Sequence, residues 1–338
     1  MSTSQVTLHF ADGEQALVHC DTESNIFNAA KAGGIGLAHD CLNGSCGTCK
    51  GHLRSGAVDY AMERSLLAVS GDEPDAVLVC QAQPVSASLD IELPYTRASL
   101  LPQKKRMLKI ISKTKVSATV WDVRCKVEKL RMFEFLPGQY VKVSPQGQDF
   151  MRAYSPYTLP GKNEVGFLIR ELANGAMSGY LNESPVVGDV WNVEGPFGVF
   201  YRRHTIAPSL YIAGGTGLAP ILSMLSDQER LQQPTGPKHL VFGVSRLEDL
   251  FYTDELNALH AKIADLTVTL AVVDGIQGPN CVKGSVLDAL SPALFQSLGT
   301  TGATYLCGPP AMVGAIRDRA QEWDVPLQRF YTEEFLPT

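Results

Sequence analysis

The N-terminal part of the chain alternates apolar and polar positions in short runs, which predicts β-strands. Runs at 6–10 and 16–19 flank an Asp12-Gly13 turn, and apolar runs at 77–80 and 88–93 predict two more strands. Residues 25–32 have a helical period that ends at Gly33-Gly34. We therefore expect a small α+β domain over residues 1–94. A linker is predicted at 95–103, in a proline-containing stretch without periodicity.

Residues 104–205 show repeated strand signals and little helix. Apolar runs at 107–111, 140–143, 152–155, 165–169 and 190–194 are separated by turns that contain glycine or proline. Close turn spacing of this kind is typical of a small antiparallel β-barrel. One short helix is predicted near residues 177–181.

From residue 206 the pattern changes to alternating strands and helices. Apolar, β-rich runs occur at 210–213, 240–243, 266–273 and 304–307, and a last short strand is predicted at 330–331. Helical periods occur at 219–231, 254–263, 286–298 and 311–323. This alternation predicts a doubly wound parallel sheet, and hence an α/β domain over residues 206–338.

Composition adds limits on the class of protein. The chain has 338 residues, of which 45% are hydrophobic and 19% charged, as is typical of a globular protein with two or three domains. No run of about 18 apolar residues is present. The first residues lack the features of a secretory signal, so we expect a cytoplasmic protein without membrane segments.

Charge is distributed unevenly along the chain. Residues 1–93 contain twelve acidic and four basic side chains, a net charge of −8, whereas residues 94–115 contain seven basic side chains and no acidic one. An acidic first domain argues against binding to nucleic acid, because phosphates would be repelled. The asymmetry suits docking between oppositely charged protein faces, although a merely solvated surface is the alternative.

Three cysteines lie within nine residues, at Cys41, Cys46 and Cys49, and Cys80 follows later. The C-x₄-C-x₂-C…C spacing is that of plant-type [2Fe–2S] sites. Zinc, which usually prefers two C-x₂-C pairs, is the alternative, and disulfides are disfavoured in a chain without a leader. The spacing therefore predicts an iron–sulfur cluster.

Two segments of the predicted barrel suit a flavin nucleotide. Arg152, Tyr154 and Ser155 offer a charge for pyrophosphate, an aromatic face for a flat ring and a hydroxyl donor. Gly175-Ala176-Met177-Ser178 opens the predicted short helix, where backbone N–H groups favour phosphate. Each segment alone is weak evidence, since an arginine on a barrel surface or a glycine-led helix start is common.

The segment Gly214-Gly215-Thr216-Gly217 follows a predicted strand and opens a helix, as a phosphate-binding turn requires. It matches neither G-x-G-x-x-G nor the P-loop, which argues against ATP or GTP. Cys307-Gly308-Pro309 ends another predicted parallel strand, where ligands of open α/β sheets bind. For the other cysteines we expect inert packing. They are Cys20, Cys125 and Cys281.

These motifs, in this order, resemble those of the reductase components of aromatic-ring-hydroxylating dioxygenases, close to the naphthalene and benzoate dioxygenase reductases. The resemblance covers essentially the whole chain. It implies a β-grasp [2Fe–2S] ferredoxin domain, then an antiparallel FAD-binding β-barrel, then the doubly wound NAD-binding domain.

The resemblance also implies the roles of individual residues. The cluster ligands would be Cys41, Cys46, Cys49 and Cys80. FAD would be bound by Arg152, Tyr154, Ser155, Gly175, Met177 and Ser178, with Phe335 shielding the flavin ring. The nicotinamide nucleotide would be held by Gly214, Gly215, Thr216, Gly217, Cys307, Gly308 and Pro309. Ser155 at the flavin N5 edge and Cys307 beside the nicotinamide C4 are the expected catalytic residues.

The implied activity is oxidation of NADH by hydride transfer to FAD, followed by single-electron transfer through the cluster. The acceptor would be a Rieske-type oxygenase, reached directly or through a small ferredoxin. A monooxygenase hydroxylase or a deoxysugar dehydratase is the alternative partner, and a non-redox metal-bearing module is the alternative of another class. Arg246 suits a 2′-phosphate whereas Glu248 and Asp249 repel it, so NADH is expected. We expect a monomer.

Overall fold

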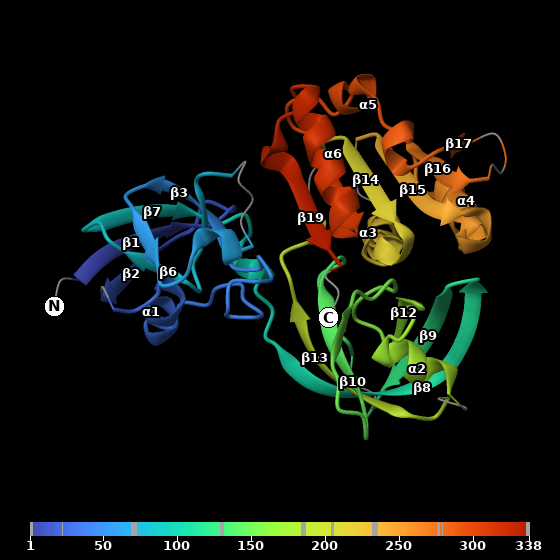
Figure 1. Ribbon diagram of the computed structural model, residues 1–338, viewed down its shortest axis with the longest axis horizontal. Coiled ribbons are helices and arrows are strands. Elements are labelled where there is room, and N and C mark those ends of the chain that lie inside the picture. The colour runs from blue at the N-terminus through green and yellow to red at the C-terminus, as the bar shows by residue number, and fades with distance from the viewer. Residues whose placement is uncertain are drawn as a thin grey trace. The chain divides into compact units, whose positions relative to one another are not determined.

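A computed structural model of the protein describes residues 3–21, 23–68, 73–128, 132–183, 187–203, 206–231, 236–275, 278 and 280–335. The chain divides into two compact units. The first is Met1–Gln103 with Phe197–Val199, and the second is Lys104–Pro196 with Phe200–Thr338. The first contains the cysteine loop, and the second contains the barrel and the parallel sheet (Figure 1).

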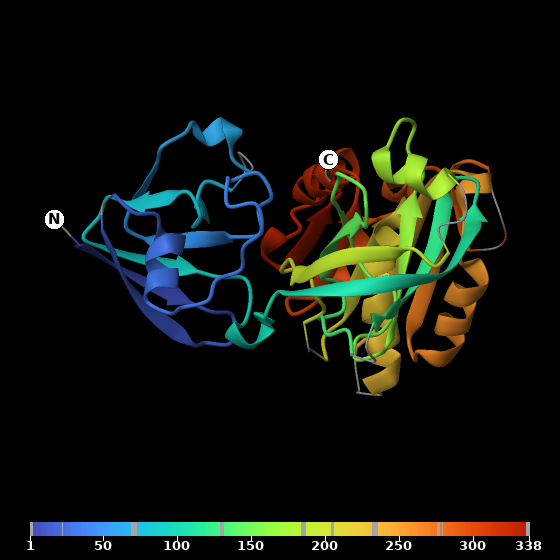
Figure 2. The same ribbon diagram turned by 90° about the horizontal axis from the view of Figure 1, so that it is seen from below.

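In its described residues, the first unit has a mixed five-stranded sheet, a two-stranded sheet of β4 and β6, and one α-helix, which confirms the predicted class. The five-stranded sheet has the order β2-β1-β7-β3-β5, with β1 antiparallel to β2 and parallel to β7. Alternate residues of β1 and β2 are buried, among them Val6, Leu8 and Val18. Helix α1, seen against these strands in Figure 2, begins after Asn25, whose side chain accepts the N–H of Asn28 at 2.8 Å. The elements are β1 (Thr3–His9), β2 (Gln15–Asp21), α1 (Ile26–Ala32), β3 (Lys50–Ser55), β4 (Val58–Tyr60), β5 (Ala76–Leu78), β6 (Ala82–Pro84) and β7 (Ser88–Glu92).

The segment 95–103, predicted as a linker, belongs to the first unit. The side chain of Tyr95 is fully buried, and its hydroxyl accepts the N–H of Ala38 at 3.2 Å. The N–H of Arg97 donates to the carboxylate of Asp12 at 3.1 Å. This stretch therefore has packing contacts of its own.

The second unit begins with a six-stranded antiparallel sheet that curls into a barrel. Its order is β11-β10-β13-β8-β9-β12, and an isolated bridge between Pro156 and Phe167 links the segment after β11 to β12. Trp191 and Phe167, both fully buried, lie at the centre of the barrel core. The elements are β8 (Lys104–Ser117), β9 (Val120–Val127), β10 (Tyr140–Pro145), β11 (Arg152–Tyr154), β12 (Glu164–Arg170), α2 (Ala176–Asn182) and β13 (Val190–Phe197).

The rest of the second unit is a parallel six-stranded sheet of order β17-β16-β15-β14-β18-β19. Alternate residues of β14 face opposite sides: Tyr211 packs with α3 and α4, and Ile212 packs with α5 and α6. The sheet is therefore doubly wound, as predicted, with its switch point between β14 and β18. The elements are β14 (Ser209–Gly214), α3 (Leu218–Leu231), β15 (Lys238–Arg246), α4 (Thr253–Lys262), β16 (Leu266–Asp274), β17 (Cys281–Lys283), α5 (Pro292–Gln296), β18 (Ala303–Gly308), α6 (Pro310–Glu322) and β19 (Phe330–Glu334).

Some expected elements are wrong in detail. The helix predicted at 286–298 is a 3₁₀ turn, Val286–Ala289, followed by α5, because Ser291 caps a new helix that Pro292 begins. Strand β9 is not among the predicted strands, although apolar and charged residues alternate along it from Val123 to Val127. Cys80 does not end a strand: β5 stops at Leu78, and Cys80 lies two residues further on, in a turn.

Candidate functional site

The cysteine loop adopts a backbone that glycine makes possible. Gly44 and Gly47 have φ angles of +84° and +71°, in the left-handed region. A Cβ on Gly44 would also lie 2.5 Å from a methyl carbon of Leu67. These two turns reverse the chain within the loop that carries three of the four predicted ligands, Cys41, Cys46 and Cys49.

The four predicted cluster cysteines form two thiol pairs. Cys46 donates a hydrogen bond to Cys41, and Cys49 donates one to Cys80. The bond from Cys49 lowers the pKa of Cys80 to about 6, and burial raises the pKa of Cys46. Four thiols close enough to shift one another's pKa values suit a centre that is held by four cysteines, as the spacing predicts.

The predicted flavin residues lie together at the end of β11. Arg152 is half-buried, its Nη1 donates to the carbonyl of Met151 at 2.8 Å, and its guanidinium lies 5.6 Å from the ring centre of Phe150. Tyr154 contacts Phe167, with ring centres 6.5 Å apart, and burial raises the pKa of its phenol. Side chains of these types suit a flavin nucleotide.

Ser155 carries the clearest signal for a ligand. Its side chain is only 4% exposed, and within the described part of the chain its Oγ has no hydrogen-bond partner. A buried hydroxyl without a partner is costly and uncommon in native proteins. A polar ring atom of a bound flavin would satisfy it, so the residues present fit FAD.

In the second predicted flavin segment, Gly175–Ser178, two side chains take part in the packing and hydrogen bonding of the barrel domain. Met177 is buried in the barrel core, and Ser178 Oγ accepts the N–H of Leu172 at 2.8 Å. Gly175 is the N-cap of α2. The side chains of Met177 and Ser178 are thus engaged in the fold, and a phosphate here would be bound by the N–H groups of the first helical turn.

The predicted nucleotide turn lines a hollow of about 200 Å³ at the carboxyl ends of β14, β15 and β16. Gly214, Gly215 and Thr216 form one wall, with Pro309 beside them. A Cβ on Gly217 would lie 2.2 Å from the carbonyl oxygen of Cys307, and only glycine allows that contact. A glycine-containing wall at the start of a helix suits the phosphates of a dinucleotide.

Cys307 and the C-terminal strand meet at the same end of the sheet. Cys307 is fully buried, and burial, reinforced by Glu333, raises the pKa of its thiol well above the ordinary value. The N–H of Phe335 donates to the carbonyl of Gly308 at 3.1 Å, and its half-buried ring packs against the core of the parallel-sheet domain. The turn, Cys307 and Phe335 thus converge from three segments.

Three family models match consecutive parts of the chain. A 2Fe-2S iron-sulfur cluster binding domain matches residues 9–85, an oxidoreductase FAD-binding domain matches 107–201, and an oxidoreductase NAD-binding domain matches 211–318. Their order is the order of the three sites described above.

Curated relatives match along almost the whole chain. The toluate 1,2-dioxygenase electron transfer component of Pseudomonas putida is 35% identical, and the 2-halobenzoate 1,2-dioxygenase electron transfer component of Burkholderia cepacia is 33% identical; each alignment covers 98% of both chains. The chain belongs to the family of dioxygenase reductase components. The propane 2-monooxygenase reductase component of Mycolicibacterium goodii is 31% identical, over 93% of this chain and 92% of that one.

A solved structure supports the fold of the reductase. An Amycolatopsis cytochrome P450 reductase, 24% identical, superposes with a TM-score of 0.70 over 99% of both chains. No helix among the described residues of the reductase is long and apolar enough to cross a bilayer.

The nucleotide hollow of the reductase also contains residues that sequence reasoning missed. Thr119 and Arg170 line it from the barrel, although neither belongs to a motif. Thr119 Oγ1 donates to Asp249 at 2.7 Å. The sequence signal that could have identified Arg170 is its position, as a single arginine directly after the apolar run 165–169.

Arg246 is held by the two acidic residues that follow it. Its Nε lies 3.1 Å from Asp249 and its Nη1 lies 2.8 Å from Glu248. Although burial raises the pKa of Asp249, hydrogen bonds from Thr119 and Arg246 outweigh it and lower that pKa. Arg246 is therefore already neutralised, which disfavours a 2′-phosphate at this position.

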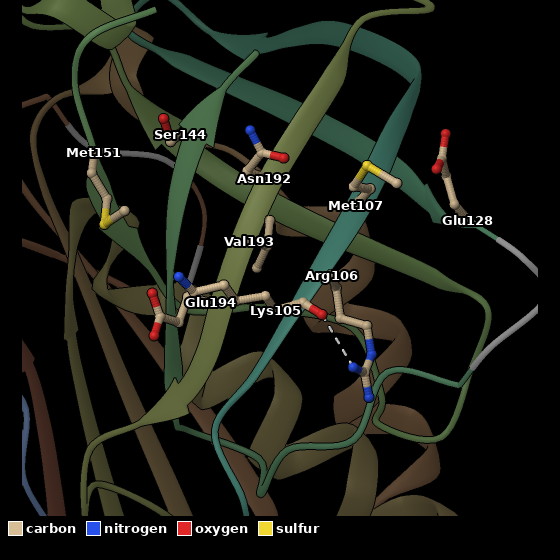
Figure 3. Close-up of a pocket in the computed structure, with 9 residues that line it drawn as sticks. All are labelled: Lys105, Arg106, Met107, Glu128, Ser144, Met151, Asn192, Val193 and Glu194. Atoms are coloured by element: carbon tan, nitrogen blue, oxygen red, sulfur yellow. Dashed lines mark hydrogen bonds between the residues drawn. The ribbon is translucent and has the colours of Figure 1, made fainter.

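A second hollow, of about 510 Å³, lies on the exposed face of β8, β10 and β13 (Figure 3). Its lining includes Met107, Met151 and Asn192, and the hydrogen bond drawn in Figure 3 runs from Arg106 Nη1 to the backbone carbonyl of Lys105 at 3.2 Å. The predicted flavin residues are not among those described as lining it.

Proposed function

We propose that this reductase oxidises NADH and delivers single electrons to the oxygenase component of an aromatic-ring dioxygenase system, directly or through a small ferredoxin. The observation that carries the proposal is that one chain combines a glycine-containing nucleotide turn with two thiol pairs. The first suits a two-electron donor, and the second suits a one-electron carrier.

The flavin is assigned to the residues around β11. Bound FAD would supply the step from paired to single electrons, because it accepts a hydride and releases electrons singly. Arg152 would neutralise pyrophosphate, Tyr154 would face the ring, and the Ser155 hydroxyl would donate to a ring nitrogen.

Cys307 is assigned a positioning role beside the nicotinamide. Since its pKa is raised, the thiol stays protonated at neutral pH and is no thiolate nucleophile. A small neutral side chain at the strand end leaves room for the ring, and Pro309, two residues further on, lines the hollow.

The experiment that tests this function is anaerobic reduction of the purified protein by NADH. We expect bleaching of both the flavin band and the iron–sulfur absorption between about 400 and 600 nm. A protein without these bands, or with bands that NADH does not bleach, would contradict the proposal.

Reconstitution then identifies the partner. NADH consumption coupled to product formation is expected with an aromatic-ring dioxygenase. The second candidate is a monooxygenase hydroxylase, favoured by the propane 2-monooxygenase reductase at 31% identity. Coupled turnover with only a monooxygenase would replace the first candidate with the second.

A further inference from the structure

Gln81 directly follows the fourth cluster cysteine and connects both sides of the cluster site. Its Nε2 donates to the carbonyl of Leu42 at 2.7 Å and to the carbonyl of Cys80 at 3.0 Å, and it lies 3.7 Å from Cys80 Sγ. An amide nitrogen has two protons for these three acceptors, so one proton is shared between the carbonyl and the sulfur of Cys80.

The position of this amide is determined by packing. Gln81 Cγ lies 3.2 Å from where a Cβ on Gly44 would be, so the absence of a side chain at Gly44 makes room for the stem of Gln81. The backbone N–H of Gln81 donates to the carbonyl of Leu78 at 2.9 Å and closes the turn that carries Cys80. The aliphatic part, the backbone N–H and the side-chain amide of Gln81 thus each have a defined contact.

The sulfur that Gln81 reaches is in the more buried thiol pair. Cys49 and Cys80 are 3% and 2% exposed, whereas Cys41 and Cys46 are half-buried. Water competes poorly for a hydrogen bond to a buried sulfur, and electrostatic effects are larger where the surroundings are less polar.

We propose that Gln81 is a positioning residue that raises the reduction potential of the cluster by donating a hydrogen bond to the sulfur of Cys80. The reduced cluster has one more negative charge than the oxidised cluster. A donor to a ligand sulfur therefore stabilises the reduced form more than the oxidised form. This inference rests on the [2Fe–2S] site of the proposed function.

The test compares Gln81→Met with wild type in the full chain loaded with FAD and cluster. Methionine keeps the length of the stem and removes the donor. In a redox titration followed by visible absorption, we expect a more negative midpoint potential for the cluster. In rapid mixing with NADH, we expect unchanged flavin reduction and slower cluster reduction.

The matched control is Gln83→Met, in the same unit. Gln83 Nε2 donates to the carbonyl of Glu23 at 3.4 Å, and Gln83 lies on β6, outside the turn that carries Cys80. We expect the wild-type potential in this variant. An equal shift in both variants would assign the effect to the fold of the unit and would overturn the proposal.

A second variant, Gln81→Glu, covers the case in which Gln81→Met does not retain its cluster. Glutamate has nearly the shape of glutamine but places a negative charge near the sulfur, so a larger negative shift is expected. A wild-type potential in whichever variant retains the cluster overturns the role of Gln81 and leaves the proposed function intact. Absence of a cluster spectrum in the wild type would instead overturn the proposed function.

Discussion

The cysteine loop and the nucleotide turn are both short, glycine-containing segments at a cofactor site, but their glycines have different purposes. Gly44 and Gly47 have positive φ angles and reverse the chain, so that side-chain thiols meet. Gly217 has no such requirement; it is needed because its missing Cβ leaves room for the carbonyl of Cys307. One site is made of reactive side chains, and the other of backbone and empty space.

The largest effect is expected from removing one of the four predicted cluster thiols. Cys80→Ser should abolish the cluster, because serine is a poor ligand for iron at this site, and with it the reduction of any one-electron acceptor. Flavin reduction by NADH should continue. Iron content and visible spectra check this, with Cys281→Ser, outside both pairs, as the control. Full acceptor reduction by Cys80→Ser would refute the assignment of Cys80.

The next effect concerns space in the nucleotide turn. Gly217→Ala places a methyl group against the carbonyl of Cys307, and we expect it to destabilise the native conformation of the turn by about 1–3 kcal/mol. We expect flavin reduction at low NADH concentration to slow about tenfold or more, measured by stopped flow. Gly314→Ala on α6, where a Cβ would meet open space, should keep full activity. Wild-type kinetics in Gly217→Ala would show that the turn does not bind the nucleotide.

A smaller effect is expected at the acidic pair beside the hollow. Glu248→Gln releases Arg246 from one of its two partners, so kcat/KM for NADPH should rise about threefold to fivefold while that for NADH changes little. Steady-state kinetics with both nucleotides measure this ratio. Asp254→Asn on α4 removes the same kind of charge away from Arg246 and should leave the ratio unchanged. An unchanged ratio in both variants would contradict this role of Arg246.

The smallest effect concerns the surface charge of the first unit. Asp59 is exposed on β4 and pairs in register with Gln83, close in sequence to Cys80. Asp59→Lys should slow reduction of a basic partner such as cytochrome c about twofold to threefold at low salt, without changing flavin reduction. Glu255→Lys, an equal change of charge in the second unit, is the control. Equal slowing in both variants would show that the docking surface for the partner does not lie on the first unit.

Prediction from the sequence succeeded where a pattern is local. Alternation and helical period identified the mixed sheet, the barrel and the doubly wound sheet, because these periods reflect which residues are buried. Prediction failed where the boundary of an element was misplaced, as at 286–298, where the cap residue Ser291 and Pro292 start a new helix, and at Cys80, which lies beyond the end of β5.

Prediction of the site divides in the same way. The roles of Met177 and Ser178 could not be read from a helix start, because their burial depends on the barrel behind them. Thr119 and Arg170 belong to no motif, and they reach the nucleotide hollow only because the barrel forms one of its walls. The site assignments themselves stay predictions until the variants above are measured.

By itself, the sequence determined the spacing of the thiols, the order of the three domains and the family, since each depends on residues near one another in the chain. Only the tertiary structure decided that the thiols form two pairs, that the Ser155 hydroxyl is buried without a partner among the described residues, and that Gln81 reaches both Leu42 and Cys80. These contacts join segments that are far apart or that turn sharply, and their distances follow from register and packing, which no local pattern encodes.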